Sequence, residues 1–493
     1  MMQYRWLSWG IPMAFVMATL GCSDPDPDNS TNNSDQNQNE EQNPGGNENP
    51  NPGGNENPNP GGNENPNPGG NENQNPGGNE NQNPGGNENP NPGDGTASTF
   101  LKDCKPGQDE ATARKLINGE ISPDEGFNSI AYSCGLPVIT SDNKAIFLHW
   151  YKGGNWSVAG AFNNWEHVAM TKHASDEFWY AEVTLGDKGE QLPGYKFVND
   201  GQYQSDPWSL RYNYDEHGEI SFYQDPGTAH LMRWRAFGSP QGLQTRDIYA
   251  WVPGITGTYD VLYAHDGQNL FDPGSMGGGW KLRENLAQIE ADFIVVGIPN
   301  TTDRFQEYTH VNDTIEWDGG MMSVEAKGDV YGAFIDQSVR PFIESKFSTT
   351  ETAGLMGSSL GGLISLYVAL LYPDRYKAAL ALSPTTAWGH FSENNTLIQE
   401  MYEKAEKRPY LVYLDSGGGA GANGCQGASP EEAREDEYQR DNYCYTNAMK
   451  ESLANLGYEY EKTLYHWHEP NAEHNEAAWA KRVFRPLEIF KNL

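Results

Sequence analysis

The spacing of hydrophobic positions divides the chain into two patterned regions. Between residues 142 and 225, apolar and polar residues alternate in short runs separated by Gly-Gly, Asn-Asn and Asp-Lys-Gly turns. A period of two is typical of strands that bury one face. The runs that show it are "AIFLHWY", "WSVAGAF", "FWYAEVTL" and "YKFVND". They predict a small β-sandwich over residues 140–226.

From residue 229 onward the period changes, and near-continuous apolar runs alternate with longer helical segments. The apolar runs are "DIYAWVP", "YDVLYAH", "DFIVVGIP", "TAGLMG", "YKAALALS" and "PYLVYLD". Such runs are typical of a parallel sheet that is covered on both faces. The helical segments include "YGAFIDQSVRPFIESKF", "LGGLISLYVALLYP" and "YTNAMKESLANLGY". Residues 229–493 are therefore predicted to form a three-layer α/β domain.

The start of the chain carries neither pattern. Residues 1–21 combine one arginine with a short apolar stretch, which predicts an export signal and is too short to cross a bilayer comfortably. The ending "LGC" resembles a bacterial lipobox, which implies that Cys22 is the lipidated first residue of the mature chain. Ser23 implies, by the same resemblance, the outer membrane. An ordinary cleaved signal peptide is the alternative.

Residues 22–98 are predicted to form a tether. The octapeptide "NPGGNENP" or "NPGGNENQ" repeats from Asn43 to Pro90. It contains no apolar residue that could offset the entropy of ordering, which predicts a solvated, flexible linker. Its reach is about 40 Å as a coil and about 150 Å when stretched toward polyproline geometry. A calcium-binding or adhesive role is the weaker alternative, because each repeat carries a single carboxylate.

Four further cysteines form two close pairs along the sequence, Cys104 with Cys134 and Cys425 with Cys444. Export permits disulfides, so both pairs are predicted to be structural bonds, the first of which clips a small segment over residues 99–139. No cysteine or histidine spacing indicates zinc. The net charge of −35 argues against a nucleic-acid partner, which requires a basic surface.

The candidate nucleophile is Ser359, in the stretch "GLMGSSLGG". Gly357, Ser359 and Gly361 satisfy the pattern G-x-S-x-G, which chance can also supply in a glycine-rich chain. Here the pattern lies between a predicted strand and a predicted helix, which is the context of a nucleophile elbow. The glycines let the two backbones approach, and Ser358 is expected to point away from the pocket. A small-residue turn without chemistry is the alternative.

A serine hydroxyl needs an adjacent base, and the base needs a carboxylate that orients it. In α/β-hydrolases these partners follow in the order Ser, acid, His. The predicted base is His474, in a polar loop before the last helix, with His468 as the second choice. His466 and His468 could also be read as a metal-binding pair, but no third ligand group is evident.

The acid is expected after the strand "PYLVYLD". Asp415, Asp436 and Asp441 are the candidates. We favour Asp441, because it precedes a predicted helix and the Cys425–Cys444 disulfide would hold it in place. Asp415 is the second choice and could instead form a turn at the strand end.

Two backbone donors are expected for the oxyanion. One is the N–H of Leu360, directly after the nucleophile. The other should come from the loop "HDGQNLFD", in which Gly267 or Gln268 is the candidate.

Four stretches of the α/β region together resemble the esterase D and enterochelin-esterase-like α/β-hydrolases, a group that includes feruloyl and acetyl-xylan esterases. They are "LYAHDGQNLFD", "DRFQEYTH", "GLMGSSLGGLISLYVALLYPDRY" and "EPNAEHNEAAW". The resemblance implies a serine esterase with Ser359 and His474 in the matching positions and without a metal or organic cofactor. It also implies that Arg304, Glu307 and Tyr308 position the substrate. An ion pair between Arg304 and Glu307 is the structural alternative.

A second resemblance concerns the predicted sandwich. "SVAGAFNNWE" and "GYKFVNDGQYQSDP" resemble the glycogen-binding-type, isoamylase N-terminal immunoglobulin-like module. Such modules bind α-glucans through exposed aromatic residues or pack against a catalytic domain. The candidate stacking residues are Trp156, Trp165, Trp179 and Trp208. The alternative, which we favour, is that these tryptophans are core and interface residues.

These expectations combine into a surface-tethered serine esterase that acts on carbohydrate or phenolic-acid esters, either small molecules or polysaccharides. A siderophore esterase and an acyltransferase are the enzymatic alternatives. The non-enzymatic alternative is a glucan-binding lipoprotein with an inert hydrolase domain.

Overall fold

The computed structural model describes residues 101–102, 104–317, 320–419, 425 and 441–493. All of them belong to one compact unit, residues 90–493. The predicted signal peptide, Cys22, the repeat linker and Asp436 lie outside the described residues. Within those residues, no helix is long and apolar enough to cross a membrane.

The α/β region is built on eight neighbouring strands in the order β20-β19-β18-β17-β13-β14-β12-β11. All six apolar runs predicted to be strands are strands, and "EKTLYHWHE" supplies another. Pairing is parallel from β20 to β14. The strands are β11 (His230–Phe237), β12 (Arg246–Val252), β13 (Tyr259–His265), β14 (Ile294–Ile298), β17 (Thr349–Ser358), β18 (Ala378–Leu382), β19 (Leu411–Ser416) and β20 (Leu464–His468).

The prediction of a parallel sheet is wrong for β12, which pairs antiparallel with β14. Only residues 253–258 connect β12 to β13. A connection that returns the chain in the same direction needs a crossover of about a dozen residues or more, usually a helix. The link after β12 is too short for that, so the strand runs the other way.

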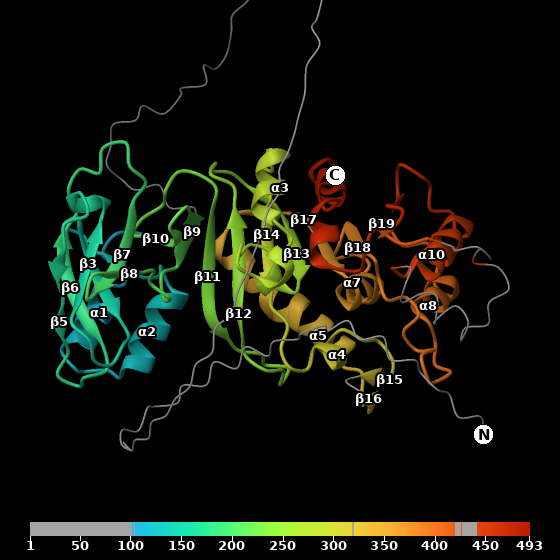
Figure 1. The fold of residues 1–493 in the computed structure, drawn as a ribbon, viewed down its shortest axis with the longest axis horizontal. Helices are drawn as coiled ribbons and strands as arrows, with labels where there is room; N and C mark the ends of the chain where they lie inside the picture. Colours follow the sequence, from blue (N-terminus) through green and yellow to red (C-terminus); the bar gives the residue numbers. More distant parts are fainter. Residues whose placement is uncertain (1–100, 103, 318–319, 420–424, 426–440) are drawn as a thin grey trace, which may run out of the picture. The chain divides into compact units, whose positions relative to one another are not determined.

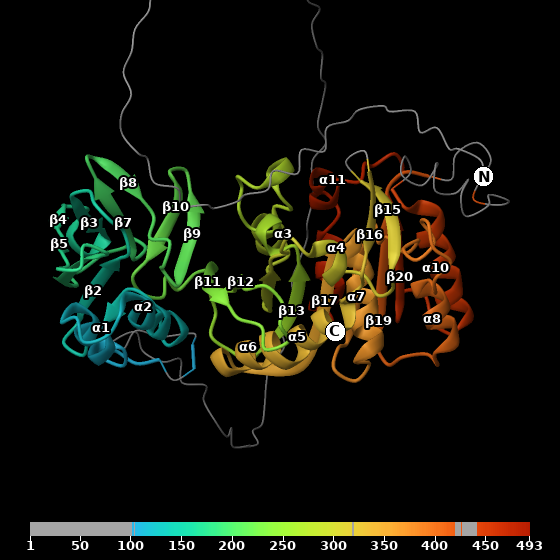
Figure 2. The same cartoon turned by 90° about the horizontal axis from the view of Figure 1, so that it is seen from below.

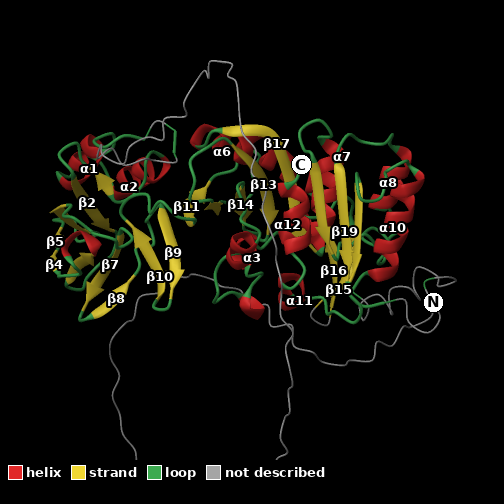
Figure 3. Ribbon diagram, turned by 90° about the horizontal axis from the view of Figure 1, so that it is seen from above, coloured by secondary structure: helices red, strands yellow, loops and turns green. Residues whose placement is uncertain are grey.

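Helices cover both faces of this sheet, as predicted for three layers. Along β13, Val261 and Tyr263 join one hydrophobic core, and Leu262 and Ala264 join the other, because successive side chains of a strand point to opposite faces. In Figure 1, α3 lies above these strands, and α5 and α7 lie below them. Figure 3 shows the same layers coloured by secondary structure.

The helices fall into two sets by the core that they join. One set is α3 (Leu282–Gln288) and α12 (Phe484–Lys491). The other set is α5 (Gly328–Phe334), α6 (Arg340–Lys346), α7 (Leu360–Leu371), α8 (Ile398–Lys404) and α10 (Tyr443–Asn455). Two short helices, α4 (Arg304–Glu307) and α11 (Glu476–Ala480), and the hairpin β15 (Asp313–Trp317) and β16 (Gly320–Val324) complete the region.

The segment predicted as one helix over residues 331–347 is divided by a π-helical turn, Ile335–Val339. Pro341 follows this turn at the start of α6. Proline has no N–H to donate to the carbonyl four residues earlier, so the regular helical ladder is interrupted there. The helix also begins three residues earlier than expected, at Gly328.

The N-terminal strands form two further sheet portions, and the four predicted runs are all strands. One sheet has the order β1-β2-β6-β5, and the other portion is β9-β10-β7-β3-β4, with β8 paired to β7. The bounds are β1 (Val138–Ile139), β2 (Lys144–His149), β3 (Trp156–Gly160), β4 (Val168–Ala169), β5 (Thr171–Lys172), β6 (Trp179–Thr184), β7 (Gly194–Asn199), β8 (Gln202–Gln204), β9 (Arg211–Asp215) and β10 (Gly218–Phe222).

The two regions share one continuous sheet. Strand β9 pairs antiparallel with β11 through Tyr212 opposite Leu231 and Arg211 opposite Met232. This pairing extends the sheet of the α/β region into the N-terminal strands, and the continuous sheet has 14 strands, including β8, which pairs only with β7. Figure 2 shows β9, β11 and β12 side by side at this junction. The two regions are therefore joined edge to edge by backbone hydrogen bonds.

The four candidate stacking tryptophans have different surroundings. Trp156 and Trp179 are buried, and the indole N–H of each donates to the Gly153 carbonyl, at 3.1 and 3.0 Å. Both belong to the core, as the favoured alternative held, and neither exposes a face on which a sugar could stack. Trp208 stacks on Trp150 with ring centres 5.3 Å apart. The partly exposed Trp165 lies beside Tyr203, at 6.5 Å between ring centres.

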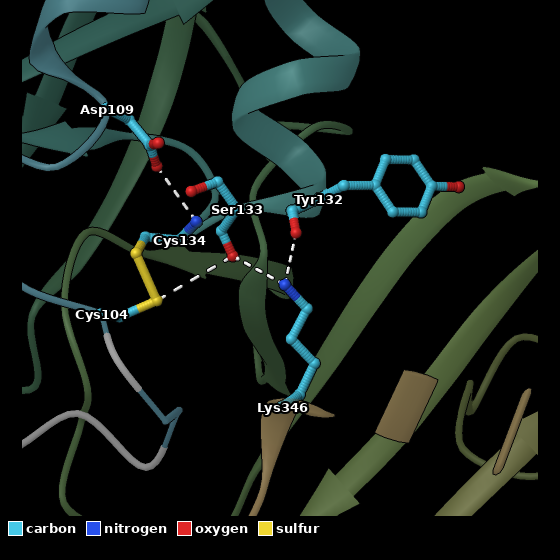
Figure 4. Close-up of a disulfide and its surroundings, with 6 residues drawn as sticks. All are labelled: Cys104, Asp109, Tyr132, Ser133, Cys134 and Lys346. Carbon is cyan, nitrogen blue, oxygen red and sulfur yellow. Dashed lines mark hydrogen bonds between the residues drawn. A yellow bond between two sulfur atoms is a disulfide. The ribbon is translucent and has the colours of Figure 1, made fainter. Parts of the chain in front are cut away.

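Both predicted disulfides are formed. The Cys104–Cys134 bond ties the chain before α1 (Glu110–Ile117) to the residues after α2 (Pro123–Tyr132). Figure 4 shows that the Lys346 ammonium, at the end of α6, donates to the carbonyls of Tyr132 and Ser133 beside this bond. The disulfide-clipped segment is thus anchored to a helix of the α/β region.

We expect acid to weaken the fold through His149. This side chain is 3% exposed, and its ring centre lies 4.2 Å from that of Trp156 and 4.3 Å from that of Phe197. Burial lowers the pKa of His149 to about 4, against about 6.5 in an unfolded chain. The unfolded chain therefore binds this proton first, so the stabilisation is complete above about pH 6.5 and is lost as the pH falls toward 4.

Urea unfolding at about pH 7.5 and about pH 4.5 measures the effect. His149→Phe should reduce the acid-induced loss of unfolding free energy by about 2 kcal/mol. The exposed His217 offers a control, His217→Gln, which should leave that loss unchanged. An equal loss in wild type and His149→Phe would contradict the prediction.

Candidate active site

Ser359 occupies a sharp turn between β17 and α7. Its backbone has φ 56° and ψ −124°, a conformation that is strained for a residue with a side chain. A Cβ on Gly357 would lie 2.6 Å from the carbonyl carbon of Gly361, so only glycine fits at position 357. This is the geometry of a nucleophile elbow. A serine held under backbone strain favours a chemical role over a simple small-residue turn.

The hydroxyl of Ser359 lies 3.2 Å from that of Thr385. The backbone N–H of Thr385 also donates to the Ser359 carbonyl, at 3.1 Å. Ser359 is half-buried, whereas Ser358 is 3% exposed. Of the two adjacent serines, Ser359 is the one with access to solvent.

His474 and Asp441 form the central pair of the site. His474 Nδ1 lies 2.5 Å from Asp441 Oδ1, and the imidazole packs edge-on against Trp479 at 5.1 Å between ring centres. A histidine whose Nδ1 bonds a carboxylate keeps Nε2 for proton exchange with a nucleophile. No hydrogen bond between Ser359 and His474 is present among the described residues, and such bonds often tighten only when substrate binds.

The two other histidines near the C-terminus have different partners. His468 Nε2 bonds the Gly418 carbonyl at 3.0 Å, and its ring packs on Tyr443 with centres 4.3 Å apart. Burial lowers the pKa of His466 to about 4. Of His466, His468 and His474, only His474 therefore has a hydrogen bond to a candidate acid among the described residues.

The candidate acids lie close together but face different groups. Asp441 precedes α10, is 3% exposed, and receives hydrogen bonds from Ser383 Oγ at 2.6 Å and from the Gly417 N–H. Asp415 lies at the end of β19 and bonds the Ser383 N–H and the Tyr413 hydroxyl, each at 3.0 Å. Burial raises the pKa of Asp415 to about 6. Asp415 makes no bond to His474.

The loop after β13 lies directly against the elbow. A Cβ on Gly361 would lie 3.3 Å from Asp266 Oδ2. Gly267 begins a 3-10 turn, Gly267–Asn269, and a Cβ there would lie 2.6 Å from the carbonyl carbon of Gly297. Gln268 uses its side-chain oxygen to accept from the Asn300 N–H at 3.1 Å.

The Leu360 N–H belongs to the first turn of α7, where helical amides have no intrahelical acceptor. This amide directly follows Ser359 in the elbow, and the loop that contains Gly267 and Gln268 packs against the elbow. Leu360 and the two candidates for the second donor, Gly267 and Gln268, therefore lie on adjoining elements.

Asp266 anchors this loop. Arg304 Nε and a terminal guanidinium nitrogen bond its two carboxylate oxygens, each at 2.8 Å, and Asn300 Nδ2 adds a third bond at 2.6 Å. The Asp266 N–H donates to the Tyr308 hydroxyl at 3.1 Å. Asp266 has φ 55°, so these contacts hold a left-handed residue immediately before Gly267.

The residues predicted to position substrate, Arg304, Glu307 and Tyr308, instead bond other protein groups around this loop. The structural alternative, an Arg304–Glu307 ion pair, is not formed, because Glu307 pairs with Arg246 through two bonds of 2.7 Å. Glu307 and Tyr308 have no exposed surface, so direct contact with substrate does not fit them. Sequence reasoning missed Asp266 and Arg246; the position of Asp266 next to the oxyanion glycine was the available signal.

Residues 249–488 match the family model described as "Putative esterase". This segment contains Ser359, Asp441 and His474, together with the loop of Gly267. The match to the segment that carries the elbow and its histidine–aspartate pair supports a carboxylic ester hydrolase.

Two curated proteins of Bacillus subtilis (strain 168) are also similar. "Uncharacterized protein YjcH" is 28% identical over 130 residues, which are 26% of this chain and 49% of that protein. "Uncharacterized protein YbbA" is 26% identical over 244 residues, 47% of this chain and 86% of that protein. The chain thus spans about half the length of the first relative and most of the second.

Similar solved structures include three esterases or hydrolases. Enterochelin esterase from Shigella flexneri is 14% identical with a TM-score of 0.39, over 70% of this chain and 92% of that one. A ferulic acid esterase is 13% identical with a TM-score of 0.39, over 54% and 98%. Siderophore hydrolase EstA from Aspergillus nidulans is 18% identical with a TM-score of 0.38, over 53% and 94%.

Proposed function

We propose that this protein is a serine carboxylesterase with Ser359 as nucleophile, His474 as base and Asp441 as the acid that orients it. The observation that carries the proposal is the His474–Asp441 hydrogen bond of 2.5 Å in the same segment as a strained serine elbow. Both lie within the part of the chain that matches the esterase family.

The proposed reaction has two halves. Ser359 Oγ attacks the ester carbonyl while its proton passes to His474 Nε2, and the oxyanion accepts hydrogen bonds from the Leu360 N–H and from that of Gly267 or Gln268. Collapse expels the alcohol, which takes the proton from His474. Water then attacks the acyl-enzyme by the same route, releasing the acid and restoring Ser359.

Glu476 favours neutral substrates over anionic ones. It begins α11, two residues after His474, and is half-buried. Burial raises the pKa of Glu476; the charge of Asp266 acts in the same direction, and His474 and Arg304 oppose it. Arg304 is already engaged by Asp266. A polyanionic siderophore would meet the Glu476 carboxylate, so we propose a carbohydrate ester or a phenolic-acid ester as substrate.

The location and the N-terminal region complete the proposal. Cys22 would carry the lipid that anchors the chain at the cell envelope, and the repeat linker would hold the esterase away from the membrane. Residues 140–226 would form an immunoglobulin-like module of the glycogen-binding type. Trp165 and the 48% exposed Tyr203 are an aromatic pair with surface available for an α-glucan.

A panel of esters tests the substrate class with the purified chain. We expect hydrolysis of p-nitrophenyl acetate and methyl ferulate and much slower hydrolysis of the iron(III) complex of a tricatechol trilactone, because that complex is a trianion. Preference for the trilactone would favour the siderophore alternative. Transfer of the acyl group to added sugar at the expense of hydrolysis would favour an acyltransferase.

A pull-down on insoluble α-glucan tests the N-terminal region independently of catalysis. The whole chain should be retained, and Trp165→Ala should elute earlier than wild type. Equal retention of the two proteins would contradict the assignment of Trp165.

A further inference from the structure

Behind Asp441 lies a buried arginine that the proposed reaction does not use. Arg482 lies between α11 and α12 and is 1% exposed. Its Nε is 3.0 Å from Asp415 Oδ1, and a terminal nitrogen is 3.3 Å from Asp441 Oδ2. The same nitrogen donates to Ser383 Oγ. One guanidinium therefore joins two of the three candidate acids, Asp415 and Asp441.

Ser383 connects this arginine to the acid at close range. Its hydroxyl donates to Asp441 Oδ2 at 2.6 Å and accepts from Trp479 Nε1 at 3.2 Å. Its carbonyl accepts from Asn442 Nδ2 at 2.9 Å. Ser383 itself has φ 41°, so its backbone adopts a strained conformation that these bonds stabilise.

The orientation of Asp441 depends on these partners. Asp441 and Asn442 both have positive φ, at 53° and 57°, so no regular strand or helix directs the side chain. Oδ1 is used by His474, and Oδ2 is shared by Ser383, Gly417 and Arg482. Arg482 is the only cation among the described partners of Oδ2.

The cluster also carries an excess of negative charge. Asp415 and Asp441 face one arginine, with the Tyr413 hydroxyl and Trp479 as the neutral neighbours. Glu476, whose charge interacts with that of His474, adds a further carboxylate. Removing one partner of a buried charge pair leaves the other charge uncompensated.

We propose that Arg482 is a positioning residue for the catalytic acid, which holds the Asp441 carboxylate on His474 and, together with Asp415, sets the electrostatic potential at the imidazole. The inference rests on the proposed function. Arg482 acts through Asp441 and touches neither the substrate nor the nucleophile. Its effect should therefore appear in kcat and in the pH profile, and leave KM nearly unchanged.

The test compares Arg482→Met, Asp415→Asn and the double variant, each assayed as kcat/KM against pH with p-nitrophenyl acetate. Loss of the cation makes the potential at His474 more negative and stabilises the imidazolium, so Arg482→Met should move the acidic midpoint up by about one pH unit. Loss of the Asp415 charge acts oppositely, so Asp415→Asn should move it down by about half a unit.

The double variant removes both charges, so its midpoint should lie between those of the single variants, about half a unit above the wild-type value. We also expect kcat of Arg482→Met to fall about 10- to 100-fold with KM within about twofold of wild type. Thermal unfolding reports the folded fraction of each variant. If Arg482→Met does not fold, the acidic midpoints of Asp415→Asn and of the double variant still test the inference. The midpoint should fall in Asp415→Asn and rise again in the double variant.

Midpoints that do not move, or that move in the same direction for both single variants, would overturn the inference and assign Arg482 a purely structural role. This failure is distinct from failure of the proposed function. In the latter case, wild type would not hydrolyse esters, or Ser359→Ala would match it.

Discussion

Ser359→Ala should lower kcat/KM for p-nitrophenyl acetate by about 10⁴-fold or more, to the level of background hydrolysis. Removing the hydroxyl removes the atom that attacks the carbonyl, and nothing else on the elbow can take its place. The fold should be unaffected, because the hydroxyl bonds only Thr385 among the described residues. Initial rates at saturating and limiting substrate measure the loss.

The neighbouring serine provides a matched control. Ser358 ends β17 and is 3% exposed, so Ser358→Ala makes the same chemical change one residue away. We expect it to keep kcat/KM within about threefold of wild type. Activity of Ser359→Ala above a tenth of wild type, in a preparation free of other esterases, would be incompatible with Ser359 as nucleophile.

Asp441→Asn should lower kcat by about 10³- to 10⁴-fold with little change in KM, as the same substitution does in a serine-protease triad. The amide keeps the shape of the side chain, but it no longer accepts the Nδ1 proton of His474 as a carboxylate does. The imidazole then loses the tautomer and the charge stabilisation that the transfer of the Ser359 proton requires. Steady-state kinetics of the folded variant measure the effect.

The competing acid is the control. Asp415→Asn makes the same change on a carboxylate that bonds Ser383 and Tyr413 instead of His474. We expect kcat to fall by less than about tenfold, because Asp441 keeps its bond to the imidazole. A larger loss in Asp415→Asn than in Asp441→Asn would reverse the assignment of the acid.

Features with a local origin were predictable from the sequence. All six apolar runs form strands of the α/β sheet. A strand that is buried on both faces is recognisable because about five to seven consecutive residues are apolar. The elbow followed from two glycines between a strand and a helix. The direction of β12 did not follow, because it depends on which strand the short link of residues 253–258 reaches.

Side-chain partnerships were less accessible, because they join residues that are distant in sequence. The structural alternative for Arg304 was an ion pair with Glu307, three positions away, but Arg304 pairs with Asp266, which lies 38 residues earlier. Ser383 and Arg482 are 99 residues apart and were not singled out at all. A buried charge takes the partner that the folded backbone presents, and sequence spacing says little about that partner.

The pairing of β9 with β11 has a practical consequence for truncation. A cut between residues 226 and 229 would free one edge of each strand, including the buried side chains of Tyr212, Leu231 and Met232. Unpaired edges of this kind are templates for intermolecular strand addition. Either half expressed separately should therefore self-associate, and a soluble fragment should begin before Cys104 and retain both halves.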